Sequence, residues 1–184
     1  MKTLILFRHA KSGWDAPVDR DFDRPINARG IQGAQMIGRY LREKGWDFDQ
    51  VISSPAVRCT ETLDALWEGY GEILHPNWDR RIYLASGATL LDVVQDLPDS
   101  AERVMMCGHN PGLEDLILTL VPDKAGDPLR DAVEEKFPTA AVATLTLDVD
   151  QWRDAGRGKA QFTQLVRPRD LDPNLGPAMD HPSD

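Results

Sequence analysis

The chain has 184 residues, of which 41% are hydrophobic and 28% charged, a length and a mixture that suit one globular domain with its own core. Its formal net charge of −9 argues against nucleic acid or a membrane surface as the main partner, because both favour basic protein faces. Two cysteines are too few for a disulfide framework. Because no leader and no bilayer-spanning apolar run is visible, we expect a cytoplasmic protein.

Strands and helices are predicted to alternate along the chain. Short apolar runs predict strands at residues 3–7, 50–53 and 103–107. Apolar residues at helical spacing predict helices at residues 28–44, 56–68, 89–97 and 113–120. Alternating patterns predict two antiparallel strands at residues 140–147 and 160–166. The sequence therefore predicts an α/β fold of three layers, α/β/α, with a mainly parallel central sheet and an antiparallel addition near the C-terminus.

The remaining segments lack a clear period and are predicted to be irregular. They are residues 15–27, 75–81 and 123–136. In the first of these, Asp19, Asp21 and Asp23 are interpreted as a solvated acidic loop, and the last is expected to be polar and mobile. We predict a single domain over residues 1–166, followed by an extended tail rich in Pro and Asp over residues 167–184.

Basic residues occur where the predicted parallel strands end. Arg8 and His9 follow the first strand, Arg58 begins the helix after the second strand, and His109 follows the third. Because the carboxyl ends of parallel strands lie at one edge of a sheet, we expect these side chains to converge. Arginine forks and helix N-termini both bind phosphate oxygens, so the sequence predicts a site for a phosphoryl group.

Three motifs at these strand ends resemble those of a known family. Residues 7–12 read FRHAKS and resemble the Arg-His-Gly signature of the histidine phosphatase superfamily, with Ala10 in the place of glycine. Its second-arginine and second-histidine motifs resemble residues 53–62 (SSPAVRCTET) and 108–112 (GHNPG). Together with residues 24–30 (RPINARG), they make the chain most similar to the SixA-type phosphohistidine phosphatases. The resemblance implies a phosphoglycerate mutase-like fold without a helical lid.

The same resemblance assigns roles to individual residues. It implies four catalytic residues, namely Arg8, His9, Arg58 and His109. His9 would attack phosphorus and form a phosphohistidine intermediate, while the cations around it stabilise the charge. Ser12 and Asn110 are expected to bind the substrate, and Lys11 is interpreted as a solvated charge that attracts anions. No metal ion and no cofactor is implied, because the arginines would take the place of a metal.

A general acid is not evident in the sequence. Related phosphatases carry a glutamate in the segment that here reads WDRRIYL, at residues 78–84, where Asp79 is the nearby carboxyl group. An alkoxide leaving group needs a proton, whereas the leaving nitrogen of a phosphohistidine is far less basic. The short stretch between Arg58 and His109 also predicts a shallow, open pocket.

Together these features favour cleavage of phosphohistidine on a protein, for example a histidine-phosphotransfer domain. Two alternatives remain open at this stage: a phosphomonoesterase for a small phosphorylated metabolite, and a phosphate-binding or phosphoprotein-binding module without turnover. Neither the physiological substrate nor the oligomeric state is indicated by the sequence.

Overall fold

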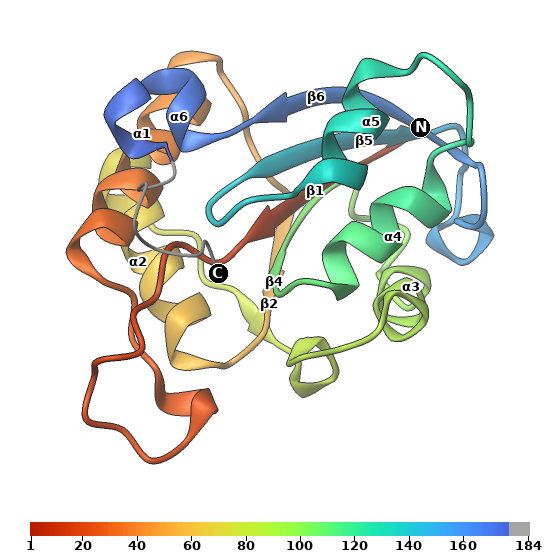
Figure 1. The fold of residues 1–184 in the computed structure, drawn as a ribbon. Coiled ribbons are helices and arrows are strands. Elements are labelled where there is room, and N and C mark those ends of the chain that lie inside the picture. The colour runs from red at the N-terminus through yellow and green to blue at the C-terminus, as the bar shows by residue number, and fades with distance from the viewer. Residues whose placement is uncertain (177–184) are drawn as a thin grey trace.

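A single six-stranded sheet forms the centre of the molecule (Figure 1). The computed structural model describes residues 1–176, so the end of the predicted tail, residues 177–184, lies outside the described residues. The strands are β1 (Lys2–Arg8), β2 (Gln50–Ser53), β3 (Asn77–Trp78), β4 (Arg103–Gly108), β5 (Val142–Leu147) and β6 (Ala160–Val166). In the order β3-β2-β4-β1-β5-β6, the first four are parallel, whereas β5 is antiparallel to β1 and to β6. This topology confirms the predicted sheet.

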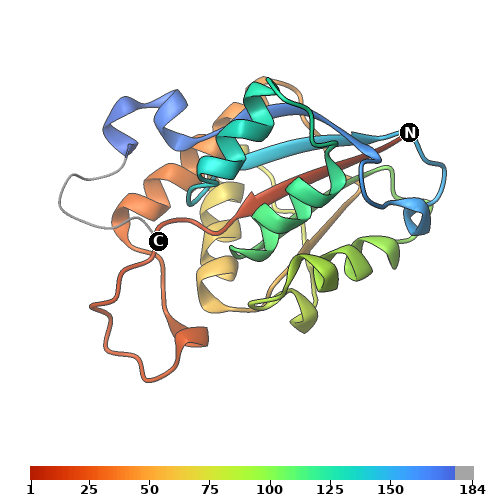
Figure 2. The ribbon, with the colours of Figure 1, turned by 45° about the vertical axis from the view of Figure 1, so that its right-hand side comes forward.

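Helices cover both faces of this sheet. They are α1 (Ala28–Glu43), α2 (Val57–Tyr70), α3 (Gly87–Gln95), α4 (Gly112–Leu120), α5 (Pro128–Glu135) and α6 (Pro168–Leu171). Figures 1 and 2 show α1, α2 and α6 grouped apart from α3, α4 and α5. Alternate residues of β1 point to opposite faces of the sheet. Leu4 and Leu6 pack in one buried cluster, and Ile5 and Phe7 pack in the other. The three predicted layers are therefore confirmed.

The two long helices α1 and α2 touch through their glycines. A Cβ atom on Gly38 would lie 2.1 Å from the carbonyl oxygen of Leu66, and one on Gly69 would lie 1.9 Å from that of Gln35. The missing side chains let the two backbones approach directly. At its start, α1 is capped by Asn27, whose side chain accepts a hydrogen bond from the amide of Gly30 at 2.9 Å. The predicted helix and its cap are therefore confirmed.

Two segments that were predicted to lack regular structure are helical. Residues 123–136 contain α5, which begins after Asp127 as its N-cap and with Pro128 in its first turn, and Val133 of this helix is fully buried. The start of the predicted extended tail forms α6, and Pro168 packs against Gly33 of α1. Burial of apolar side chains thus supports a helix in each segment, and the predictions of irregular structure at residues 123–136 and of an extended chain from residue 167 are wrong for the described residues.

The segment between α2 and α3 adds an edge to the sheet. Residues 75–81, predicted to be irregular, contain the two-residue strand β3 and enter a 3₁₀ turn at Arg80–Ile82. Ile82 is buried in the core, and α3 packs beside α4 rather than standing free. Among residues 1–176, every helix is too short or too polar to span a bilayer.

Candidate active site

His9 lies at the carboxyl end of β1, held by main-chain bonds on both sides. Its amide donates to the carbonyl of Gly108 at 3.1 Å, and its carbonyl accepts from Ala140 at 3.0 Å. The ring nitrogen Nδ1 lies 2.8 Å from the carbonyl oxygen of Ala10. Because a carbonyl only accepts, Nδ1 carries the hydrogen, and in the neutral imidazole the lone pair is on Nε2.

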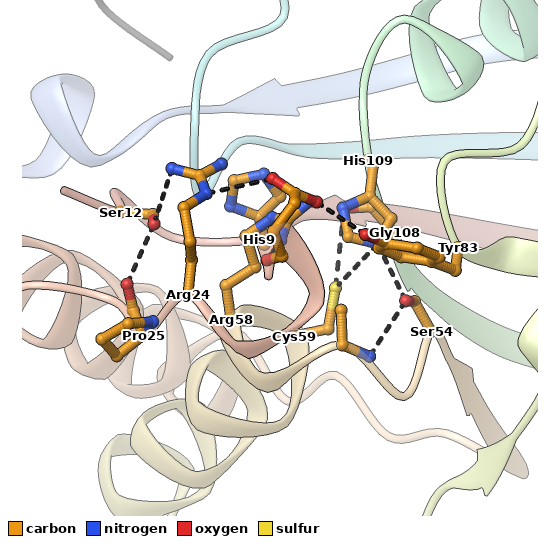
Figure 3. Close-up of polar contacts among 12 residues, drawn as sticks. His9, Ser12, Arg24, Pro25, Ser54, Arg58, Cys59, Tyr83, Gly108 and His109 are labelled. Carbon is orange, nitrogen blue, oxygen red and sulfur yellow. Dashed lines mark hydrogen bonds and ion pairs between the residues drawn. The ribbon is translucent and has the colours of Figure 1, made fainter. Parts of the chain in front are cut away.

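The four predicted catalytic residues meet at this edge of the sheet, where the charges of Arg8, Arg58 and His109 all act on His9; Figure 3 shows His9, Arg58 and His109 together. The rings of His9 and His109 have centroids 5.4 Å apart and are tilted by 53°. The exposed fractions of Arg8, His9, Arg58 and His109 are 7%, 4%, 2% and 3%. The expected convergence is therefore observed. All four side chains are buried in the folded chain.

His109 is oriented by residues at the end of β2 and the start of α2. Its Nε2 lies 2.8 Å from Oγ of Ser54 and 3.6 Å from Sγ of Cys59. The ring of Tyr83 meets it edge-on, with centroids 5.5 Å apart. Nδ1 of His109 is buried and has no hydrogen-bond partner within residues 1–176, which leaves one ring nitrogen for a ligand.

Arg58 is bound by Asp21, a residue predicted to be solvated. Nη1 of Arg58 donates to the carbonyl of Asp21 at 2.9 Å, and Nη2 donates to its Oδ2 at 3.0 Å. The hydroxyl of Tyr83 donates to the same Oδ2 at 2.7 Å. Partial burial acts to raise the pKa of Asp21, but the bonds from Tyr83 and Arg58 outweigh it and hold that pKa at about 2. The solvated-loop interpretation is therefore wrong for Asp21.

Ser12 supports a further arginine. The hydroxyl of Ser12 donates to the carbonyl of Pro25 at 2.9 Å and accepts from Nη1 of Arg24 at 3.1 Å (Figure 3). Nε of Arg24 donates to Oδ1 of Asp21 at 3.1 Å, so that this carboxylate joins Arg24 to Arg58. The hydroxyl of Ser12 is therefore already hydrogen-bonded within the protein. Ser12 would act on the substrate indirectly, by positioning Arg24, rather than by the direct contact that was predicted.

Asn110 is likewise engaged with the protein. Its Nδ2 donates to the carbonyl of Phe137 at 2.7 Å and to Oε1 of Glu114 at 3.0 Å. The same carbonyl of Phe137 accepts from Nη1 of Arg8 at 3.2 Å. Asn110 thereby holds the segment that fixes Arg8. Its Oδ1 is buried without a partner in the part of the chain that the structure describes.

The charge around His9 keeps its imidazole neutral. Burial, and then the nearby charge of Arg8, lower the pKa of His9 well below its usual value, and His109 and Arg58 act in the same direction. The bond to the Ala10 carbonyl opposes them. At neutral pH the ring therefore carries a free lone pair.

Four residues of this site were not predicted from the sequence, namely Asp21, Arg24, Ser54 and Tyr83. The RPINARG and SSP segments were singled out as similar to the family, but that similarity gave no role to their individual residues. Thr62 was also missed, although it joins two motifs: its hydroxyl accepts from the amide of Ala10 at 2.8 Å and donates to the carbonyl of Arg58 at 2.5 Å.

Comparison with known proteins agrees with this geometry. Residues 4–82 match the family model of the histidine phosphatase superfamily (branch 1). A candidate phosphohistidine phosphatase SixA from Agrobacterium tumefaciens shares 28% identity and superposes with a TM-score of 0.75, covering 91% of this chain and 98% of its own. A second, from Nakamurella multipartita, shares 26% identity with a TM-score of 0.79, covering 91% and 96%. The chain is thus similar to the histidine phosphatase superfamily in sequence over residues 4–82 and to these SixA structures over most of its length.

Two further proteins resemble this chain over most of its length. An uncharacterised protein of Mycobacterium tuberculosis is 29% identical over 88% of this chain and 99% of its own length. A protein histidine phosphatase SixA complexed with tungstate shares 20% identity and the same fold, with a TM-score of 0.75 over 92% and 99% of the two chains. The superfamily and these neighbours support a phosphatase with a phosphoglycerate mutase-like, SixA-type fold.

Proposed function

We propose that this chain is a histidine phosphatase, which uses His9 as its nucleophile and removes the phosphoryl group from phosphohistidine on a protein. The observation that carries the proposal is the state of the His9 ring, whose Nδ1 is bound to the carbonyl of Ala10 while its pKa is lowered well below the usual value. A neutral imidazole with its Nε2 lone pair free is the form that can attack phosphorus.

In the first step, Nε2 of His9 forms a bond to phosphorus as the bond between phosphorus and the substrate imidazole breaks. The electron pair of the broken bond stays on the substrate nitrogen, and the imidazole leaves in its neutral form because its other nitrogen carries a hydrogen. Negative charge on the phosphoryl oxygens is stabilised by the guanidinium groups of Arg8 and Arg58. Nε2 of His109 is engaged by Oγ of Ser54 at 2.8 Å, so that Nδ1 of His109 is left to donate to the phosphoryl group.

In the second step, water attacks the phosphorus of phosphorylated His9. The bond between phosphorus and Nε2 breaks, its electron pair returns to the ring, and inorganic phosphate leaves. The same cations stabilise both transition states, since the group transferred is the same.

The carboxyl groups beside the site support phosphohistidine as the substrate. Asp21 has a pKa of about 2 and is bound to Arg58, so it is ionised at neutral pH. Asp79 caps a 3₁₀ turn and pairs with Arg81 at 2.8 Å, which lowers its pKa. Neither supplies a proton readily in the free protein, and cleavage of a P–N bond depends less on such a proton than cleavage of a P–O bond does.

Burial of the site favours a second candidate, a phosphatase for a small phosphorylated metabolite. His9 and Arg58 are only 4% and 2% exposed, and a small molecule reaches such groups more easily than a folded protein does. A phosphate-binding module without turnover is the third candidate.

Three substrates distinguish these functions: a histidine-phosphorylated phosphotransfer domain, a phosphoserine peptide and a sugar phosphate. The proposal predicts the highest kcat/KM for the phosphotransfer domain and no turnover by His9→Ala. A preference for the sugar phosphate would support the second candidate. Binding of all three without release of phosphate would support the binding module.

A further inference from the structure

A groove with a basic rim lies beside the candidate active site. Its walls come from the start of α1, from α6 and from the segment that precedes β5. Small and apolar residues form its floor, among them Gly33, Ala140 and Pro168. Lysines and arginines stand around this floor, although the chain as a whole carries a net charge of −9.

Four of the five cations that line the groove form no ion pair within residues 1–176, and one of these, Arg29, donates to the carbonyl of Gly176. Lys11, Lys136 and Arg169 line the groove, and none of them forms an ion pair with any residue in the 1–176 range. In contrast, Arg167 is paired with Asp170 at 2.8 Å. Because unpaired charges that lie together repel one another, this arrangement favours an anionic ligand.

The pKa of Lys136 agrees with this geometry. Burial lowers that pKa, and the charges of Arg8, Lys11 and Arg169 lower it further, while the charge of Glu114 opposes them without reversing the shift. Arg8 belongs to the candidate active site, so the positive potential of the groove and that of the site are continuous.

The groove and the site also share their backbone. Lys11 follows His9 by two residues, and the amide of Ala140 donates to the carbonyls of Arg8 and His9 at 3.1 and 3.0 Å. Lys136 directly precedes Phe137, whose carbonyl accepts from Arg8. A ligand seated in the groove therefore lies next to a group that binds at His9.

We propose that this groove docks an acidic segment of the protein that carries the phosphoryl group. Separate cations around an apolar floor match a peptide on which carboxylates flank an apolar side chain. A phosphatase with a net charge of −9 would otherwise repel an acidic partner, and the groove gives that partner one local point of attraction. The proposal rests on the proposed function, because it names the surface through which the phosphoprotein is recognised.

The test compares two double variants of the full chain with equal loss of charge. Lys136→Gln/Arg169→Gln removes two rim cations. Arg157→Gln/Lys159→Gln removes two exposed cations between β5 and β6, at the opposite end of the strands from His9. The probe is a fluorescently labelled, unphosphorylated peptide with Asp and Glu on both sides of one Leu, and its affinity is measured by anisotropy at low and raised salt.

We expect the rim variant to bind the acidic peptide about tenfold more weakly at low salt, the control variant to match the original protein, and added salt to weaken binding by the original protein. Hydrolysis of an aryl phosphate should change much less than peptide affinity in the rim variant, because that substrate does not fill the groove. Equal affinity of the rim and control variants, or a peptide with Lys in place of Asp and Glu binding as tightly, would overturn the proposal.

Failure of docking and failure of the proposed function give different results. The anisotropy measurement involves no phosphoryl transfer, so loss of acidic-peptide binding in the rim variant alone supports docking whichever substrate is hydrolysed. If the rim variant instead loses affinity for a small bisphosphate while neither protein binds the peptide, the groove recognises a small anion and the proposal is wrong.

Discussion

Asp21 accepts two hydrogen bonds from the guanidinium group of Arg58. Its Oδ2 lies 3.0 Å from Nη2, and its carbonyl oxygen lies 2.9 Å from Nη1. This is the group that the family resemblance assigns to the phosphoryl oxygens. An incoming phosphoryl group therefore meets an ionised carboxylate already bound to that arginine, in a protein that holds the pKa of Asp21 at about 2.

We predict that Asp21→Asn binds inorganic phosphate more tightly. The substitution removes a negative charge next to the anion and leaves the carbonyl bond to Arg58 intact. Removing one close like charge should lower the inhibition constant for phosphate by about two- to tenfold. The matched control is Asp23→Asn, whose carboxylate pairs with the exposed Arg20. Weaker inhibition in Asp21→Asn would instead mean that Asp21 mainly holds Arg58 in position.

Replacement of Ser54 should slow the reaction without weakening substrate binding. Ser54→Ala removes the partner of Nε2 of His109, so both the hydrogen position and the orientation of the ring become less defined. Loss of about 1 kcal/mol corresponds to a roughly fivefold lower kcat. KM should stay the same, and Ser54→Thr should restore part of the rate. A Ser54→Ala protein with unchanged kcat would contradict this role.

The titration of His9 is predicted to occur well below pH 6.5. Because burial and Arg8 lower its pKa in the folded state, the unfolded chain binds the proton first as the pH falls. The contribution of His9 to the free energy of unfolding should therefore be constant above about pH 6.5. Below that pH the free energy of unfolding should fall by up to about 1.4 kcal/mol per pH unit.

NMR of the His9 imidazole checks this titration directly. The ring should remain neutral through pH 6.5 in the original protein, and its pKa should rise in Arg8→Gln, which removes one of the charges that lower it. Urea unfolding of His9→Asn at several pH values should show a shallower loss of stability below pH 6.5. A His9 ring that is half protonated at pH 6.5 would contradict the electrostatic account.

The strand ends could be predicted because two simple rules fix them. Apolar runs of strand length specify β1, β2 and β4, and parallel pairing then brings Arg8, Arg58 and His109 to one edge of the sheet. No detail of the loops is needed for that conclusion.

The lining of the site could not be predicted in the same way. Asp21 reaches Arg58 across 37 positions and Tyr83 across 62, and no local pattern marks such contacts. Segment 123–136 is a different case, because a signal was present. Asp127 followed by Pro128 is typical of a helix start, and the spacing of Leu129 and Val133 fits one helix face. The many charges around these residues masked that signal.

Two glycines of α1 should differ sharply when a methyl group is added. A Cβ atom on Gly30 would lie 2.3 Å from the carbonyl oxygen of Lys11, in the loop after His9, whereas one on Gly33 would meet Cγ of Pro168 at 3.4 Å. We expect Gly30→Ala to lower the free energy of unfolding by about 1–3 kcal/mol. Gly33→Ala should change the free energy of unfolding by no more than about 1 kcal/mol, because the higher helix propensity of alanine offsets the close contact with Pro168.

Urea unfolding measures both changes. Since Lys11 belongs to the loop that carries Ala10 and His9, Gly30→Ala should also reduce turnover of an aryl phosphate, while Gly33→Ala should not. Equal stability of the two variants would mean that the loop moves without cost and that its close contact with α1 does not fix the position of His9.

The most direct measurement is rapid quenching of the reaction with a histidine-phosphorylated phosphotransfer domain, followed by mapping of the phosphoryl group on this chain. We predict transient phosphorylation of His9 at Nε2, the nitrogen left free by the bond from Nδ1 to Ala10, and none in His9→Ala. Turnover with no phosphoryl group on His9, or with one on His109 instead, would contradict the assignment of His9 as nucleophile.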